Sequence, residues 1–375
     1  MKTSNDFGAR ILGDIGGTNA RFAWQAGPGA PLQHGLILSC ADHPTLAAAI
    51  DEYLRRIGAP RPAAASIAIA NPIQGDHVQM TNHSWSFSIR EMQRSFKLKQ
   101  FVVLNDFKAI ALALPALPVE DLRQVGGGQS CNDGPRAVIG PGTGLGVAGL
   151  VGDDRGGWVA IDGEGGHATL AATNEREWRV IEWLDRRYGH ASAERAVSGP
   201  GLADLYTALR EIDGDGSRDG GRDGSRDGGR DGSHDGGRDG NGHRDGVRAG
   251  DEPIAIDAAT ITGLALEGQD RRAIEALDLF CAFLGIVAGN LALTLGATGG
   301  VYIGGGIVPR LGGFFDRSSF RSRFEAKGRF ASYVASIPTF VIVRETSPAL
   351  IGAERALDAA IATEDAARAA VSRRS

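Results

Sequence analysis

Gly13-Asp14-Ile15-Gly16-Gly17-Thr18-Asn19 lies near the N-terminus, between two segments with the composition of strands, residues 11–12 and 20–24. Glycines in a turn of this kind adopt positive φ angles and let another group approach the backbone closely. The backbone amides and the Thr18 hydroxyl would form a nest for phosphate oxygens, and the Asp14 carboxylate can hold the accompanying Mg²⁺ through water. An ordinary glycine hairpin is the alternative, and this stretch alone does not exclude it.

A second stretch repeats the pattern. Residues 137–139 and 147–150 are strand-like, and Gly140-Pro141-Gly142-Thr143-Gly144-Leu145-Gly146 joins them. Two units of strand, glycine turn and strand at the head of successive α/β segments indicate a duplicated architecture. Placed face to face, the two turns would clamp the β- and γ-phosphates of a nucleotide. The repetition therefore favours phosphate binding over an ordinary hairpin.

The composition describes a globular protein large enough for two domains. The chain has 375 residues, of which 42% are hydrophobic and 23% are charged. A net charge of −5 argues against nucleic acid as the main partner. The three cysteines are far apart in the sequence, so neither a disulfide framework nor a zinc site is indicated. We expect reduced thiols in the cytoplasm, and the N-terminal residues show no apolar run typical of a signal peptide.

One uncharged segment is long enough to span a membrane. No charged residue occurs between Asp278 and Arg310. Residues 296–300, Gly-Ala-Thr-Gly-Gly, divide the segment into a helix-like part and a strand-like part. A buried helix followed by a buried strand explains this pattern, and no membrane segment is predicted.

Polar residues follow several of the predicted strands. Residues 101–104 end on Asn105 and Asp106, and residues 158–161 end on a turn that contains Glu164 and His167. The carboxyl ends of buried strands are where α/β proteins place their ligands. Taken alone, each residue has an ordinary alternative: a helix N-cap for Asn105 and Asp106, or a structural histidine for His167.

A third glycine cluster, residues 304–306, follows the predicted strand at residues 300–303. Consecutive glycines would let the adenine or ribose of a nucleotide lie directly on the backbone. A tight turn with no ligand is the alternative.

Residues 213–251 are of low complexity, with alternating Arg-Asp-Gly-Gly and Arg-Asp-Gly-Ser units. The segment has no apolar residue before Val247 and so cannot bury a core, which predicts a disordered insertion.

The nucleotide signatures with an invariant lysine or a dinucleotide fingerprint are absent, and the remaining pattern resembles the bacterial-type ATP-dependent glucokinases of the hexokinase, actin and chaperone superfamily. The resemblance covers nearly the whole chain in family order, except residues 213–251. The matching stretches are GDIGGTNARFA, ANPIQGD, MTNHSWSFS, LNDFKAIALALP, IGPGTGLGVAGL, DGEGGH, SAERAVSGPGL, GGVYIGGGIVPR and FEAKGRF.

The resemblance implies the roles of the site residues. Asp106 would be the catalytic base and would bind the sugar together with Asn105, while Glu164, His167 and Glu194 would bind glucose hydroxyls. Carboxylates accept hydroxyl hydrogen bonds, and a neutral imidazole donates or accepts. Taken alone, Glu194 would read as a solvated helix charge. The residues implied to bind ATP are Gly13, Asp14, Ile15, Gly16, Gly17, Thr18, Gly142, Thr143, Gly144, Gly305 and Gly306, with Asp14 also facing Mg²⁺.

The implied fold is α/β, a duplicated ribonuclease-H-like, actin-like ATPase architecture with two lobes around a ligand cleft. Residues 1–115 and a C-terminal helix of about 348–375 would form the small lobe, and residues 116–347 the large lobe. The implied activity is transfer of the γ-phosphate of ATP to the 6-hydroxyl of glucose, in a cytoplasmic homodimer.

Two other functions fit parts of the pattern. A sugar-sensing regulator would keep the pocket and lose turnover, but an intact Asp106 argues against it. An actin- or chaperone-like ATPase would share the phosphate clamp, but the paired sugar carboxylates argue against that.

Overall fold

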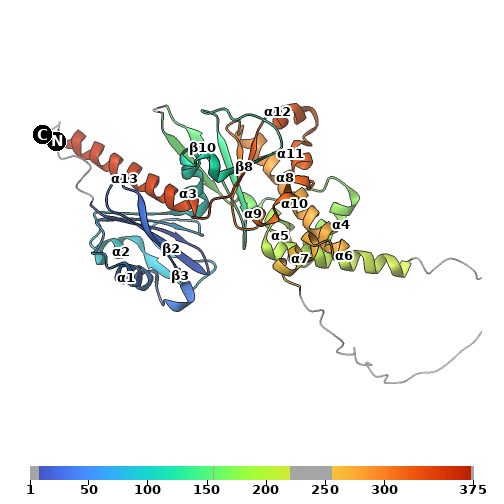
Figure 1. Cartoon of the computed structure of the whole chain (residues 1–375), viewed down its shortest axis with the longest axis horizontal. Helices are drawn as coiled ribbons and strands as arrows, with labels where there is room; N and C mark the ends of the chain where they lie inside the picture. Colours follow the sequence, from blue (N-terminus) through green and yellow to red (C-terminus); the bar gives the residue numbers. More distant parts are fainter. Residues whose placement is uncertain (1–7, 155, 220–255, 373–375) are drawn as a thin grey trace, which may run out of the picture.

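The computed structural model describes residues 8–154, 156–219 and 256–372 (Figure 1). Two β-sheets form the centres of two halves of the molecule, and helices cover them. The first sheet is built from residues near the N-terminus and the second from the remainder of the chain.

The first sheet has the strand order β3-β2-β1-β4-β7. Strands β1 and β2 are the two arms of the predicted N-terminal hairpin, while β1, β4 and β7 run parallel. Ile15 therefore lies opposite Ile69, and Ile69 opposite Asn105, so that the three strands end at the same edge. Its strands are β1 (Arg10–Ile15), β2 (Asn19–Gln25), β3 (Leu32–Ser39), β4 (Ala64–Ile69) and β7 (Gln100–Asn105).

The second sheet repeats this topology. Its order is β11-β10-β9-β12-β13-β8, and β9 and β10 are the arms of the second glycine hairpin. Counted from the first hairpin strand, both sheets have the order 3-2-1-4-5, with β8 added at the edge of the second. This confirms the duplicated fold. Its strands are β8 (Leu122–Val125), β9 (Arg136–Pro141), β10 (Leu145–Gly152), β11 (Trp158–Gly163), β12 (Val301–Ile303) and β13 (Thr339–Ile342); a separate ribbon pairs β5 (His77–Gln79) with β6 (Ser86–Ser88).

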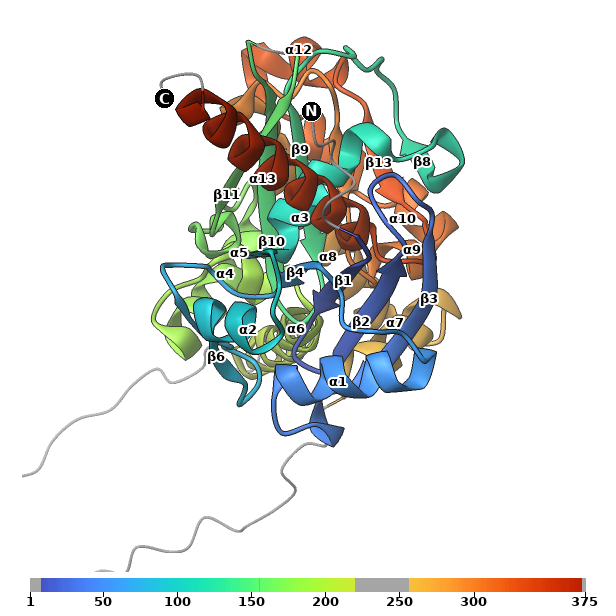
Figure 2. The ribbon, with the colours of Figure 1, turned by 90° about the vertical axis from the view of Figure 1, so that its left-hand side faces the viewer.

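Two helices, α3 (Asp106–Ala113) and α13 (Pro348–Ser372), lie between the sheets, and Figure 2 shows α13 crossing in front of α3. Helix α13 also packs on β1, β4 and β7. The two helices approach very closely, because a Cβ at Gly352 would overlap the backbone carbonyl of Ala109. Buried α3 residues such as Ile110 contact both sheets in one apolar cluster, so α3 connects the two halves.

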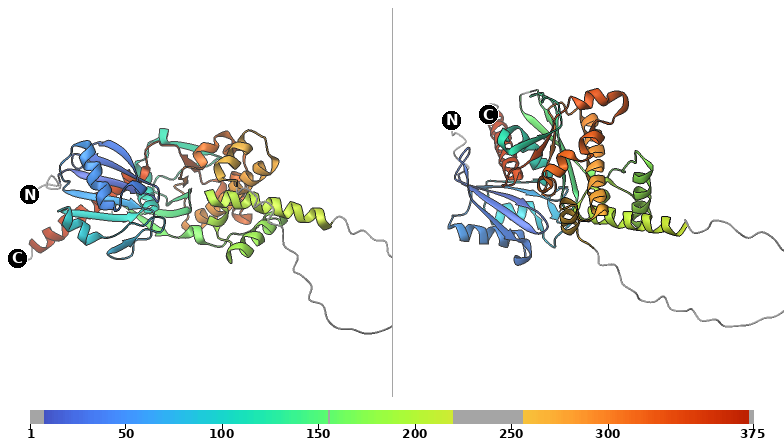
Figure 3. Two further views of the ribbon diagram at one scale, coloured as in Figure 1. Left: turned by 90° about the horizontal axis from the view of Figure 1, so that it is seen from below. Right: turned by 45° about the vertical axis from the view of Figure 1, so that its right-hand side comes forward.

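The remaining helices lie mostly in the second half, where several of them pack on one another (Figure 3). They are α1 (Leu46–Ile57), α2 (Ile89–Ser95), α4 (Glu175–Tyr188), α5 (Ala193–Ala196), α6 (Gly199–Asp219), α7 (Ala258–Leu266), α8 (Arg271–Leu295), α9 (Val308–Leu311), α10 (Gly313–Arg317), α11 (Phe320–Glu325) and α12 (Ala331–Ala335); short 3₁₀ turns are η2 (Cys40–Asp42), η3 (Leu114–Ala116), η4 (Val119–Asp121), η5 (Gly165–His167) and η6 (Gly328–Phe330).

Helix α8 contains the helix-like part of the uncharged segment, and among the described residues it is the helix long and apolar enough to cross a membrane. Of its most apolar window, 72% is buried inside the protein, which is the pattern of a core helix. Phe280, Phe283 and Leu284 are fully buried in the larger apolar cluster.

The prediction that regular structure ends at Asp213 is wrong for residues 213–219, because α6 continues to Asp219. The Asp213 carboxylate lies 2.8 Å from Arg176 and 3.5 Å from Arg272, so ion pairs to two other helices hold this part of α6. Residues 220–251, the rest of the predicted insertion, lie outside the described residues, as do residues 252–255.

Candidate active site

The first glycine turn projects from the carboxyl end of β1. Gly13 and Ile15 lie within the strand, whereas Gly16, Gly17 and the exposed Thr18 form the turn itself. Gly17 lies against Asn82, because a Cβ added at Gly17 would come within 2.9 Å of that residue. Gly16 has open space at its Cβ position, apart from the turn's own Asn19 carbonyl at 3.7 Å. The turn therefore presents backbone to the space in front of it.

Asp14 lies just before this turn and is nearly buried, with 14% of its side chain exposed. Arg21, its cross-strand partner in the hairpin, lies 3.5 Å from the Asp14 carboxylate. Burial raises the pKa of Asp14, and the Ser347 side chain and Arg21 oppose that rise. Mg²⁺ prefers oxygen ligands, so an ionised Asp14 carboxylate beside a phosphate turn is a candidate to hold the cation.

Asp106 begins helix α3 directly after β7. Asn105 caps this helix, because its side chain accepts a hydrogen bond of 3.0 Å from the Lys108 amide. The Asp106 carboxylate accepts hydrogen bonds of 3.1 Å from the Asn105 side chain and 2.9 Å from the Phe107 amide. The N-cap alternative is thus confirmed for Asn105, and it fixes the orientation of Asp106.

The electrostatic environment of Asp106 connects it to the other candidate residues. Burial raises the pKa of Asp106 to about 6, and the negative charges of Asp14 and Glu164 contribute to the rise. The three carboxylates therefore share one region. A carboxylate with a pKa near neutrality is suited to accept a proton from a substrate.

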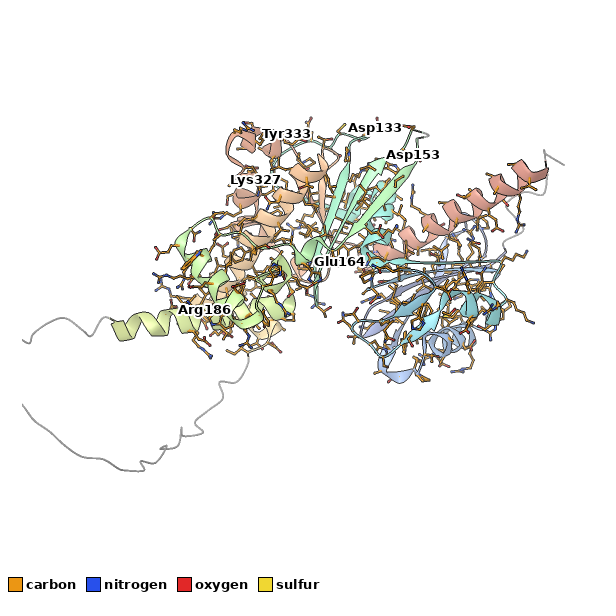
Figure 4. All side chains as sticks on the ribbon, turned by 180° about the vertical axis from the view of Figure 1, so that it is seen from behind. Asp133, Asp153, Glu164, Arg186, Lys327 and Tyr333 are labelled. Carbon is orange, nitrogen blue, oxygen red and sulfur yellow. The ribbon has the colours of Figure 1, made fainter. Side chains whose placement is uncertain are left out.

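Glu164, His167 and Glu194 lie together although Glu194 is distant in sequence. The His167 ring is between the two carboxylates, with its Nε2 at 4.0 Å from Glu164 and its Nδ1 at 4.0 Å from Glu194. Figure 4 shows Glu164 where the two halves of the molecule meet. Glu194 is anchored by the Leu145 amide, which donates a hydrogen bond of 2.9 Å to its carboxylate. Two carboxylates around an imidazole form a set that could bind several neighbouring hydroxyl groups.

The second glycine turn lies at the carboxyl end of β9. The Gly142 carbonyl accepts a hydrogen bond of 2.8 Å from Gly199, at the start of α6, and its Cβ position faces open space. Thr143 is exposed, as Thr18 is in the first turn. Gly144 has no room for a side chain, because a Cβ would come within 2.5 Å of Glu194. This turn therefore contacts the sugar-binding candidates directly.

The third glycine cluster lies beside the second turn. Gly305 has a φ of +80°, and a Cβ there would overlap the Pro141 carbonyl, so a tight turn alone accounts for this glycine. Gly306 has open space at its Cβ position, which leaves room for a ligand on its backbone. The turn accounts for Gly305, and contact of a nucleotide with Gly306 stays a prediction.

Sequence reasoning did not identify Phe107 as part of the site. Its ring occupies a slot in the second hairpin, because a Cβ at Gly146 would overlap the ring and one at Gly140 would approach it within 2.7 Å. The residue next to Asp106 is thereby seated on the strands that carry the second turn.

The sequence profile of the glucokinase family matches residues 11–360. The chain belongs to the glucokinase family. It is similar to the curated glucokinase of Aromatoleum aromaticum, with 49% identity over 95% of this chain and 96% of the relative. The glucokinase of Chromobacterium violaceum is 48% identical over 92% of this chain and 87% of the relative. Among solved structures, a glucokinase from an Antarctic psychrotroph has a TM-score of 0.75 and 33% identity, covering 94% of this chain and 99% of that chain.

Membership of the glucokinase family confirms the resemblance and the fold class that the sequence motifs implied. The relatives are named as enzymes, so the sugar-sensing regulator is not favoured.

The sequence analysis did not name two partners of Asp14, for different reasons. Arg21 follows from the hairpin register and was within reach of the sequence, whereas no sequence signal pointed to the distant Ser347.

Proposed function

We propose that this glucokinase-family chain transfers the γ-phosphoryl group of ATP to the 6-hydroxyl of glucose, with Asp106 as the base. The observation that carries the proposal is the grouping of Asp106, with its pKa of about 6, near Glu164 and Asp14. Phosphoryl transfer requires positioned phosphates, a cation and a proton acceptor for the attacking hydroxyl. The described residues supply a candidate for each.

Sugar binding is assigned to both halves of the molecule. Asn105 and Asp106 follow the first sheet, whereas Glu164, His167 and Glu194 belong to the second half. Glucose presents neighbouring hydroxyls that can satisfy both sets only when it lies between them. We assign the 6-hydroxyl to Asp106, so that this carboxylate takes its proton as the oxygen attacks phosphorus.

ATP is assigned to the two glycine turns. Thr18 and Thr143 are exposed at the two turns, where hydroxyls and free amides would bind phosphate oxygens. Gly306 would accommodate the nucleoside on its open backbone. Asp14 would hold Mg²⁺ through water, and the cation, when bound with ATP, would neutralise charge on the phosphates.

The assignment of lobes follows the same division. We propose that residues 1–115 together with α13 move as the small lobe, and residues 116–347 as the large lobe. We further propose a cytoplasmic homodimer, as the resemblance implies, and the mass in solution by light scattering tests that state.

A coupled assay of the purified full chain tests the function. With Mg²⁺ and ATP, glucose should give glucose 6-phosphate and ADP in equal amounts, whereas a reaction without sugar should release little ADP. Comparable ADP release without sugar would instead indicate an ATPase of the same fold. Glucose binding in calorimetry without any turnover would indicate a regulator.

A further inference from the structure

One ion pair connects the two halves of the candidate site. The Lys108 ammonium lies 3.1 Å from the Asp162 carboxylate, and the two residues are 54 positions apart in sequence. Lys108 is in the first turn of α3, two residues after Asp106. Asp162 is near the end of β11, two residues before Glu164. Each partner is thus adjacent to a residue assigned to the sugar.

The support of Glu164 explains why this contact matters. Among the described strands, β11 is at the edge of its sheet and pairs with β10 alone, where Asp162 lies opposite Ala148. The Glu164 side chain has 57% of its surface exposed, and beyond His167 no ion-pair partner is described for it. Helix α3 packs on β11, and Lys108 adds a polar contact near the end of the strand, two residues before Glu164.

The other side of the contact is firmly placed. The α3 residue Phe107 is seated against Gly140 and Gly146, and Asn105 caps the helix. The backbone of Lys108 is therefore held in place. Its ammonium can restrict where the Asp162 carboxylate lies. Because α3 is held firmly and β11 is an edge strand, the ion pair mainly restricts the position of β11.

We propose that Lys108 and Asp162 form a positioning pair that sets the separation of the proton acceptor Asp106 from the sugar-binding Glu164. This inference rests on the function proposed above. It assigns no contact with substrate to either residue. The pair acts by keeping the Glu164 turn in register with the start of α3, so that glucose bound by Glu164 presents its 6-hydroxyl to Asp106.

The predicted effects are modest, because 34% of the Lys108 side chain and 50% of the Asp162 side chain are exposed. Lys108→Met should lower kcat/KM for glucose roughly two- to five-fold, the size typical of an exposed ion pair. Asp162→Asn should have a similar effect. KM for ATP should stay unchanged in both, because the glycine turns are not touched.

Variants in which the two charges are exchanged distinguish loss of the ion pair from general destabilisation of the fold. Lys108→Glu alone places two carboxylates together and should impair the enzyme more than Lys108→Met does. Adding Asp162→Lys restores an attractive pair and should recover most of the lost kcat/KM. The effect of Lys108→Met should also shrink in about 1 M salt, where charges are screened within about 3 Å.

The chain offers a matched control in Arg61 and Asp51, an ion pair of 2.7 Å with 55% and 52% of the side chains exposed. Neither residue is near the candidate site in sequence, and Arg61→Met should leave kcat/KM for glucose unchanged. Melting temperatures of all variants identify any that fail to fold, and Asp162→Asn then serves in place of the failed variant.

Three results would overturn the proposal: an unchanged kcat/KM in Lys108→Met, no recovery in the reversed pair, or a parallel rise of KM for ATP. Wild-type turnover is measured in the same series. Absence of wild-type turnover would overturn the function itself, whereas normal wild-type turnover with unaffected variants would overturn only the role of the pair.

Discussion

At the residue scale, the proposed chemistry rests on Asp106. A glucose hydroxyl is a poor nucleophile at neutral pH, and Asp106→Asn keeps the size of the side chain but cannot accept the proton. Loss of a general base commonly costs about 10²–10⁴ in rate. We expect kcat to fall by that factor while glucose binding weakens far less.

Glu164→Gln is the matched comparison, since the proposal has Glu164 contact the sugar in both the ground state and the transition state. It should raise KM for glucose with a smaller change in kcat. Steady-state kinetics and glucose calorimetry on both variants measure the difference. A tenth or more of wild-type turnover in Asp106→Asn would show that Asp106 is not the base.

The pKa of Asp106 predicts an acid limb in the pH profile. The base must be ionised, and its pKa of about 6 places the loss of kcat/KM below pH 6, where the rate should fall tenfold per pH unit. An aspartate of ordinary pKa would hold its activity to about pH 4. A profile flat from pH 7 to 5 would contradict the raised pKa.

The raised pKa of Asp106 also makes the free energy of unfolding depend on pH. Because the folded state raises the pKa of Asp106, it binds more protons than the unfolded chain between about pH 4 and 6. The contribution of this group to the free energy of unfolding therefore falls as pH rises through that window. Asp106→Asn should accordingly gain melting temperature relative to wild type at pH 7.5 but less at pH 4.5.

At the element scale, α3 depends on glycines in the second hairpin. Gly146→Ala would force the Phe107 ring out of its slot, and overpacking of this kind typically costs about 1–3 kcal/mol. Since Asp106 precedes Phe107, kcat should fall at least tenfold. Gly152→Ala on the same strand is the control, because nothing lies within 4 Å of its Cβ position. Equal kinetics in the two variants would show that the slot does not position the base.

The insertion is predicted to be dispensable beyond α6. Its sequence cannot bury apolar surface, and the entropy of closing a loop changes by only about 0.6 kcal/mol per doubling of its length. Replacing residues 220–250 with a short Gly-Ser linker should leave kcat and melting temperature nearly unchanged. Asp213 must stay, since it pairs with Arg176 and Arg272. A large loss of activity in this variant would assign the insertion a role in the site.

Elements were predictable where the signal is local. Both glycine hairpins and the strand ends before Asn105 and Glu164 follow from short-range patterns, and the structure places them as expected. The extent of α6 was not predictable, because ion pairs from other helices to Asp213 hold its last turns against the local composition. The Phe107 slot and the pair of Lys108 with Asp162 depend on how the two halves meet, which no segment encodes by itself.

At the scale of the whole molecule, the proposed sugar site draws residues from both of the duplicated sheets. Asn105 and Asp106 follow the first sheet, and Glu164, His167 and Glu194 belong to the second half. Glucose bound between the two sets of residues would favour a closed arrangement of the lobes, and closure would also exclude water that could attack ATP. We therefore expect sugar to close the lobes before phosphoryl transfer.

Small-angle X-ray scattering of the full chain tests this closure most directly. Saturating D-glucose should reduce the radius of gyration, while L-glucose at the same concentration, whose hydroxyls cannot match the site, should leave it unchanged. A radius that stays the same when calorimetry shows D-glucose to be bound would contradict the assignment of the sugar to both lobes.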